Sequence, residues 1–371
     1  MENENLQSAK RRKAVKIFRS FISLVLFAVV LVTGMLEYLM LTEYRPRETE
    51  SVGVNPAYSD PLRKGDTLHI LTWNCGWGGL GDYYAEGGKG FYASDKERVT
   101  DNLTGITETS AMVDPDVVFY QEVDRESMRS HNIDEPIVIC NVLMEEYEEE
   151  YTTAFAYNYD VRFVPFPVPP VGKVRSGLMT LTDFSVETAE RIRLPSSSGW
   201  PGRLVSPKYC LLKESIPLLD SDRSLVLFNL QLEPGSVSGK DGEEDAQIRA
   251  LMDLMNEEAQ KGNYVIAGGD FGRAFSSTDI SAYMREEDES LPAAIDTEKT
   301  GGEWQYLMDS DYPTCRSLEK PYEGADRDGN RYYVIDGFIV SSNIEVKFCE
   351  TQNMDFAFSY HNPVLVECVL K

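Results

Sequence analysis

The sequence has no pair of cysteines at C-x-x-C spacing, which disfavours a zinc ribbon. Its six cysteines are scattered along the chain, and several lie inside apolar runs, such as Cys210 in KYCLLK and Cys368 in VECVLK. We expect these cysteines to be small core residues rather than disulfide partners. No internal repeat is visible, so a repeat architecture is not indicated.

Basic residues are also scarce, since 36 Lys and Arg face 61 Asp and Glu for a net charge of −25. The first 47 residues hold eight basic and four acidic residues, so the acidic excess lies in the remainder. Such a body repels polyanions and gains nothing from counterion release, which disfavours stable nucleic-acid binding. A small anionic substrate held through a metal ion remains compatible with this charge.

Charge is almost absent from residues 20–41, where only Glu37 is charged. Twenty-two helical residues span roughly 33 Å, enough for a bilayer core. Six basic residues precede this run, so we expect a cytoplasmic N-terminus and an extracellular body at the cell membrane. A cleaved signal peptide is the alternative. No small-x-small site closely follows the run, which favours an uncleaved signal anchor.

The rest of the chain predicts one linker and one domain. We expect a cytoplasmic basic segment at 1–19, the transmembrane anchor at 20–41, a Pro- and Gly-containing linker at 42–66 and a single domain at 67–371. Apolar content of 42% is normal for a chain with a core.

Short apolar runs, each followed by polar residues, predict strands in this domain, and helical spacing predicts helices at 96–113 and 243–261. Strands with intervening helices favour a layered α/β body. The strands are expected at 68–74, 116–123, 176–182, 224–232, 263–270, 332–341 and 362–370.

Polar side chains recur near the ends of these runs. Asn74 and Asp270 end their runs, Glu122 lies near the end of another, and Asp336 lies in the middle of YYVIDGFIVS. His361 stands just before the last run. Each residue alone has a structural explanation as a turn cap or a solvated charge. Together they predict convergence on one rim of the sheets, where a ligand can bind.

Five ordered motifs carry a resemblance: TWN, QEVD, GGDF, D-x-x-x-V-S and S-x-H-N-P-V. In this order they resemble the endonuclease/exonuclease/phosphatase superfamily, which includes DNase I-like nucleases, neutral sphingomyelinases and inositol polyphosphate 5-phosphatases. The resemblance covers roughly residues 67–371. It implies a DNase I-like four-layer α/β/β/α sandwich and metal-dependent hydrolysis of phosphoester bonds, usually with Mg²⁺ and alternatively with Mn²⁺.

The resemblance also implies roles for the five polar residues. Glu122 is similar to the acid that holds the metal, and Asn74 to the amide that positions metal or phosphate. Asp270 is similar to the acid that orients or deprotonates the attacking water. Asp336 and His361 are similar to the pair in which a carboxylate orients an imidazole against the phosphate.

Four further residues are candidates for substrate binding. Gln231 and Asn229 lie on one predicted strand, and Gln231 can donate a hydrogen bond to a phosphate oxygen. Asn158 and Tyr159 lie in AYNYDVRFVPFP, which could line a cleft. Ordinary loop packing is the alternative for this last pair.

The sequence departs from the family pattern at three positions. Gly272 stands where G-D-F-N has asparagine, Tyr360 where S-D-H has an acid, and Gln231 where the family usually has histidine. Arg273 and Arg175 could supply replacement cationic contacts, or they could be ordinary surface arginines.

Two hypotheses result. One is a membrane-anchored, outward-facing, Mg²⁺-dependent phosphodiesterase or phosphatase. The other is a catalytically degenerate binding domain on the same fold.

Overall fold

The computed structural model describes residues 2–57, 59, 61–80, 95–219, 221–235, 245–284, 294–300, 303–318, 322 and 330–371. The chain divides into two compact units, Met1–Tyr44 and Arg45–Lys371. Each unit is described by itself.

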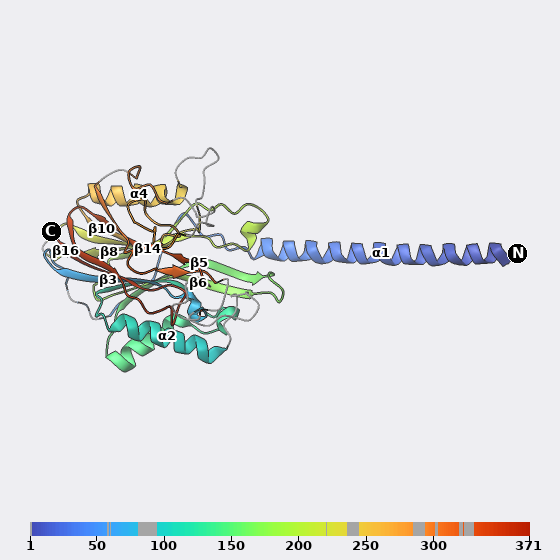
Figure 1. Ribbon diagram of the computed structural model, residues 1–371, viewed down its shortest axis with the longest axis horizontal. Helices are drawn as coiled ribbons and strands as arrows, with labels where there is room; N and C mark the ends of the chain where they lie inside the picture. Colours follow the sequence, from blue (N-terminus) through green and yellow to red (C-terminus); the bar gives the residue numbers. More distant parts are fainter. Residues whose placement is uncertain are drawn as a thin grey trace. The chain divides into compact units, whose positions relative to one another are not determined.

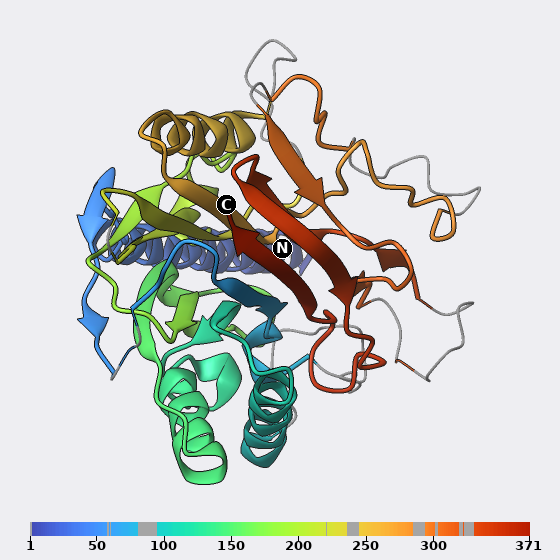
Figure 2. The ribbon, with the colours of Figure 1, turned by 90° about the vertical axis from the view of Figure 1, so that its left-hand side faces the viewer.

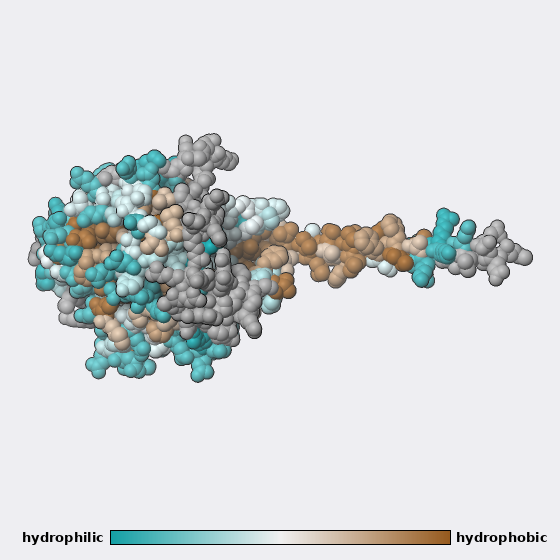
Figure 3. Space-filling view, viewed as in Figure 1, coloured by the Kyte–Doolittle hydropathy of each residue, from teal (hydrophilic) through white to brown (hydrophobic). Residues whose placement is uncertain are grey.

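The first unit is the helix α1, Glu2–Leu41. Its segment Lys10–Leu41 is long and apolar enough to cross a membrane, judged by length and composition. Figure 3 shows an apolar surface along most of this helix and hydrophilic residues near its N-terminal part. The expected apolar span and its basic flank therefore lie on one continuous helix.

The second unit contains two large sheets (Figure 1). One has the order β1-β7-β8-β9-β10-β14-β11 and the other β15-β16-β3-β4-β6-β5-β2, with β12 and β13 forming a small separate sheet. Helix α4 lies on the outer side of the first sheet and α2 on the outer side of the second (Figures 1 and 2). The expected four-layer α/β/β/α sandwich is confirmed.

The layers follow from strands that are apolar on both faces. In β3, Leu68 and Ile70 belong to the core between the sheets, whereas Leu71 and Trp73 pack in the core that includes α2. This alternation is the two-residue period of a strand. A strand with two apolar faces must be covered on both sides, so each sheet takes one face against the other sheet and one against helices.

The two covering helices have the matching helical period. Helix α4 buries Ile248, Leu251, Met252 and Met255 against the first sheet. The Asp245 side chain caps its N-terminus by accepting from the backbone N–H of Gln247. Residues 243 and 244, where the helix was expected to begin, lie outside the described residues.

The elements of the second unit have the following bounds. The helices are η1 Gly76–Gly78, α2 Lys96–Ala111, η2 Met128–Ser130, α3 Glu135–Val142, η3 Leu143–Tyr147, η4 Gly202–Leu204 and α4 Ala246–Gln260. The strands are β1 Thr49–Ser51, β2 Val54–Asn55, β3 Thr67–Asn74, β4 Val117–Asp124, β5 Thr152–Val164, β6 Gly172–Thr182, β7 Thr188–Arg193, β8 Cys210–Pro217, β9 Ser224–Gln231, β10 Tyr264–Asp270, β11 Trp304–Leu307, β12 Cys315–Arg316, β13 Tyr332–Tyr333, β14 Asp336–Ser341, β15 Ile344–Thr351 and β16 Val364–Leu370.

Two expectations about boundaries differ from the structure. The segment 42–66, expected to be a linker, contains β1 and β2, which pair with β7 and β5 and form one edge of each large sheet. The run 332–341, expected to be one strand, is divided into β13 and β14, so Asp336 begins a strand rather than lying in the middle of one. The division occurs where the backbone N–H groups of Ile335 and Asp336 both donate to the Thr314 hydroxyl instead of to a neighbouring strand.

Candidate active site

The sheet topology brings four of the predicted residues to one rim. Strands β9 and β10 are parallel and end together, with Asp270 opposite Gln231. Strand β14 is antiparallel to β10, so its first residue, Asp336, lies opposite Asp270. Asn74 ends β3 in the other sheet, and its Nδ2 donates to Asp270 Oδ2 at 3.1 Å. The rims of the two sheets therefore meet at these side chains.

Asp270, Asp336 and His361 form a buried cluster. His361 Nδ1 lies 2.8 Å from Asp336 Oδ2, and His361 Nε2 lies 4.0 Å from Asp270 Oδ2. One ligand atom from each of the three residues lies within 4.8 Å of the others. The structure therefore places these three predicted residues next to one another.

The burial of this cluster alters its protonation. Burial, with the nearby Asp336 carboxylate as a second cause, raises the pKa of Asp270 to about 7. Burial alone would lower the pKa of His361, but the Asp336 carboxylate and its hydrogen bond hold that pKa well above its usual value. The raised pKa of His361 favours the charged imidazolium beside Asp336, and a pKa of about 7 for Asp270 is in the range where a general base is useful.

Glu122 lies beside this cluster, with a different set of partners. Its Oε1 accepts three hydrogen bonds, from Asn74 Nδ2 at 3.2 Å, Gln231 Nε2 at 2.7 Å and Tyr360 Oη at 2.9 Å. Burial, followed by the Glu122 charge, raises the pKa of Tyr360 well above its usual value, so its phenol remains a donor. Two of the three departures from the family pattern, Gln231 and Tyr360, therefore converge on one carboxylate oxygen.

The other candidate substrate residues are engaged within the protein. Asn229 is fully buried between the sheets, where its Nδ2 donates to the carbonyls of Tyr120 and Met179. Asn158 is 2% exposed, and its Nδ2 donates to Gln231 Oε1 at 3.0 Å. These positions differ from the expected direct contact with substrate.

Tyr159 makes a contact of a different kind. Its hydroxyl donates to the Val205 carbonyl at 2.8 Å. This bond joins β5 to the segment after η4, which corresponds to the alternative of ordinary packing.

The two arginines that could supply replacement cationic contacts form other interactions. Arg273 is buried and forms an ion pair with Asp245, the residue that caps α4. Arg175 donates to the Tyr157 hydroxyl at 2.7 Å and pairs with Glu126 at 3.4 Å. Neither arginine makes a described contact with the Asp270 cluster.

Gly272 has a local role in the loop that follows β10. Its backbone N–H donates to Asp270 Oδ1 at 2.8 Å, which fixes the second oxygen of that carboxylate. Its φ of +66° lies in the left-handed region that favours glycine.

Two hydroxyls that the sequence reasoning missed hold the site residues in place. The Ser359 Oγ donates to the Asn74 carbonyl at 2.6 Å and accepts from the His361 backbone N–H at 3.2 Å. The Thr314 Oγ1 accepts from the Asp336 N–H at 3.1 Å. Ser359 begins the S-x-H-N-P-V motif, which was a usable signal, whereas nothing in the sequence singled out Thr314.

The residues present fit a divalent cation at one position and not at another. Asp336 Oδ1 is buried and has no hydrogen-bond partner among the described residues, and it belongs to a cluster of oxygen and nitrogen ligands. At Glu122, by contrast, three donors already surround Oε1. The prediction of a metal held by Glu122 and Asn74 is therefore not supported by the hydrogen bonds at that position.

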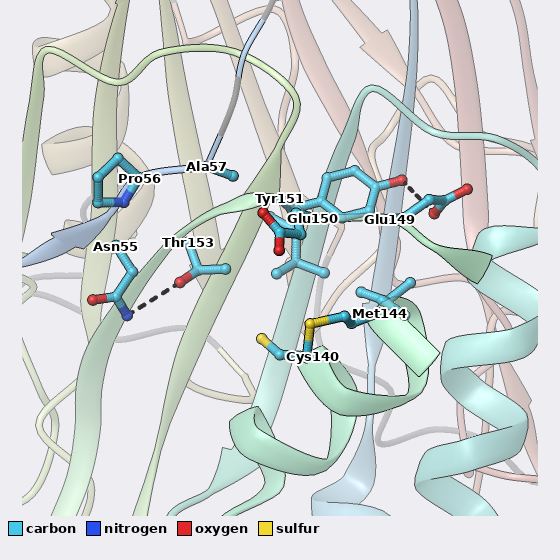
Figure 4. Close-up of a pocket in the computed structure, with 11 residues that line it drawn as sticks. Asn55, Pro56, Ala57, Cys140, Met144, Glu149, Glu150, Tyr151 and Thr153 are labelled. Carbon is cyan, nitrogen blue, oxygen red and sulfur yellow. Dashed lines mark hydrogen bonds between the residues drawn. The ribbon is translucent and has the colours of Figure 1, made fainter. Parts of the chain in front are cut away.

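A pocket of about 240 Å³ lies elsewhere, between β2, β5 and the α3–η3 segment (Figure 4). Its wall includes Cys140, Met144 and the carboxylates of Glu149 and Glu150. The Tyr151 hydroxyl in this wall bonds to Glu149 Oε2 at 3.2 Å. None of the predicted site residues lines this pocket, so it is not part of the candidate active site.

Comparisons with known proteins rest on structure. The sequence matches no protein-family profile, and no curated protein matches it. An endonuclease/exonuclease/phosphatase from Beutenbergia cavernae DSM 12333 is similar with a TM-score of 0.52 and 16% identity, over 83% of this chain and 72% of that chain. An endonuclease/exonuclease/phosphatase family protein from Leptotrichia buccalis C-1013-b has a TM-score of 0.51 and 13% identity, over 81% of this chain and 99% of that chain. The chain thus has the DNase I-like fold of the endonuclease/exonuclease/phosphatase proteins.

Proposed function

We propose that the protein is a phosphoester hydrolase of the phosphodiesterase or phosphatase type, with Asp270, Asp336 and His361 as its reacting cluster. The observation that carries the proposal is the buried His361–Asp336 pair, 2.8 Å between Nδ1 and Oδ2, with His361 Nε2 directed toward Asp270 at 4.0 Å. A positioned base beside a positioned cation is what hydrolysis of an anionic ester requires.

Each residue of the cluster has a separate task. Asp270 holds a water at its Oδ2 and accepts its proton, since its pKa of about 7 suits proton transfer near neutral pH. His361 donates from Nε2 to a phosphoryl oxygen and balances its charge. Asp336 accepts from Nδ1, which fixes the ring and keeps it charged. Asn74 donates to Asp270 Oδ2 and so orients the base.

A divalent cation, Mg²⁺ or Mn²⁺, would be held by Asp270 and Asp336, whose Oδ1 has no hydrogen-bond partner among the described residues. Bound there, it would neutralise charge on the phosphoryl oxygens. The residues of this chain would still bind the substrate, orient the water and transfer the protons.

The location of the activity follows from α1. We infer that this helix is an uncleaved signal anchor, with the basic residues before it in the cytoplasm and the body outside the cell. The substrate is then a phosphoester at or near the outer membrane surface. The acidic body disfavours long polynucleotides as substrates.

The test is hydrolysis of bis(p-nitrophenyl) phosphate and p-nitrophenyl phosphate by the full chain in detergent, with Mg²⁺ or Mn²⁺. His361→Asn should lower the rate by about 10²–10⁴-fold. The matched control is His69→Asn, because His69 pairs with Glu367 at 3.1 Å outside the cluster. Equal rates in wild type and His361→Asn would refute the proposal.

A second function is favoured by the hydrogen bonds at Glu122. A carboxylate surrounded by three neutral donors resembles a structural element more than a reacting one, which is compatible with a binding domain that retains the fold. In that case the wild-type protein binds a phosphate monoester or diester without turnover. Calorimetric titration with a non-hydrolysable phosphonate, alongside the rate assay, separates the two functions.

A further inference from the structure

The two amides beside Glu122 present N–H groups to it because their oxygens are bonded to other donors. Asn74 Oδ1 accepts from the Gly76 backbone N–H at 3.0 Å. Gln231 Oε1 accepts from Asn158 Nδ2 at 3.0 Å. A divalent cation needs oxygen ligands, so both amides are oriented against cation binding.

Tyr360 is fixed in its position by packing. Its ring meets the His361 ring edge-on, with centroids 4.3 Å apart. On another side it lies against Gly76, where an added Cβ would be 3.0 Å from Tyr360 Cδ1. The phenol cannot turn away from Glu122 without disturbing these contacts.

The backbone also directs Glu122 toward these donors. Glu122 has a φ of +53°, in the left-handed region, and lies where the register of β4 with β6 shifts between Tyr120 and Val123. A bulge of this kind re-aims a side chain. In this left-handed backbone conformation, Glu122 Oε1 accepts from all three donors.

We propose that Glu122 holds no divalent cation in this chain. The three donors take, around its Oε1, the place that a cation would need, and the carboxylate instead joins β3, β9 and the segment before β16. Tyr360 completes the set of donors around Glu122 Oε1. It stands where the S-D-H pattern has an acid, so a donor takes the place of a side chain that offers acceptor oxygens. The inference rests on this donor network and concerns the cofactor of the proposed hydrolase, but it does not require that hydrolysis occurs.

The test measures Mn²⁺ binding to the full chain in detergent by calorimetry and by electron paramagnetic resonance. Glu122→Gln should leave the Mn²⁺ affinity within about twofold of wild type. Tyr360→Asp, which supplies an acceptor beside Glu122, should create a site or tighten binding by about tenfold. That gain should disappear in the double variant Tyr360→Asp with Glu122→Gln.

Glu126→Gln is the matched control for the carboxylate, because Glu126 is an exposed acid that pairs with Arg175 and Lys173. A Glu122→Gln variant that binds Mn²⁺ at least tenfold more weakly than Glu126→Gln overturns the proposal. If Glu122→Gln does not fold, the Tyr360→Asp variant decides. Failure of that variant to gain Mn²⁺ binding then counts against the proposal. Because the readout is metal binding, an inactive wild-type protein would contradict the proposed hydrolase without affecting this result.

Discussion

Two carboxylate sites lie side by side on the same rim and have opposite surroundings. At Glu122, one oxygen accepts from three neutral donors, two of which are amides held in orientation by second partners. At Asp270 and Asp336, two carboxylates share one imidazole, and Asp336 Oδ1 has no partner among the described residues. Asn74 donates to both sites and links them.

The Glu122 site is satisfied, in the sense that its Oε1 already has three hydrogen-bond donors, whereas Asp336 Oδ1 at the other site has no partner among the described residues. The partly buried Glu122 carboxylate already accepts three hydrogen bonds on Oε1, so this oxygen has little to gain from a ligand. Asp270 and Asp336 are buried acids that share one imidazole, and burial, followed by the charge of Asp336, raises the pKa of Asp270 to about 7. We therefore expect hydrolysis by this protein to depend on Asp270 and its neighbours Asp336 and His361 rather than on Glu122.

The largest expected effect comes from Asp336→Asn, which removes the carboxylate that orients His361 and keeps it charged. Hydrolysis should fall by about 10²–10⁴-fold, because the imidazole loses both its orientation and its charge. The corresponding change at the other site, Glu122→Gln, should reduce the rate much less. Steady-state rates for the two variants, with folding checked by circular dichroism, test the comparison. Equal losses would show that the two sites act as one.

The next effect is the dependence of stability on pH in the presence of EDTA. Because the folded-state pKa of Asp270 is about 7, above that of an unfolded aspartate, the folded protein binds more protons than the unfolded chain between about pH 4 and 7. Stability from this group is fully present below about pH 4 and is lost as the pH rises through 7. His361 acts with the same sign, since its pKa is raised.

Asp270→Asn should remove the Asp270 part of this dependence, on the order of a few kcal/mol. Urea unfolding at pH 5 and pH 8 measures it. Wild type should lose more stability than the variant over this interval. A variant that loses as much as wild type would show that Asp270 titrates at its ordinary pKa in the folded protein.

How far the sequence predicts this arrangement depends on the kind of contact. The positions of Asn74 and Asp270 at strand ends were predictable, because strand ends meet at a rim and the apolar runs mark those ends. The donor set at Glu122 was not, because it depends on which way each amide is turned by its second partner. Asn229 shows the same limit, since its position on the strand gave no sign that its amide would be buried between the sheets.

The start of β14 is a further case. The run 332–341 has one charged residue, Asp336, among mainly apolar and aromatic residues, so its pattern favoured one continuous strand. The hydroxyl of Thr314, distant in sequence, takes the backbone N–H groups of Ile335 and Asp336 and so begins the strand at the acid. Periodicity carries no information about a hydrogen bond made by another segment.

The smallest expected effect concerns the satisfied site. Tyr360→Phe removes one of the three donors to Glu122 and leaves the ring packing intact, so it should destabilise the fold by about 1–3 kcal/mol, since a hydrogen bond to a charged acceptor is lost. Tyr159→Phe is the matched control, because its hydroxyl donates to a neutral carbonyl and its loss should destabilise by about 1 kcal/mol. Urea unfolding at pH 7 compares the two. If Tyr360→Phe is no more destabilising than Tyr159→Phe, the Glu122 carboxylate is not held by its donors, and the contrast between the two sites loses its energetic basis.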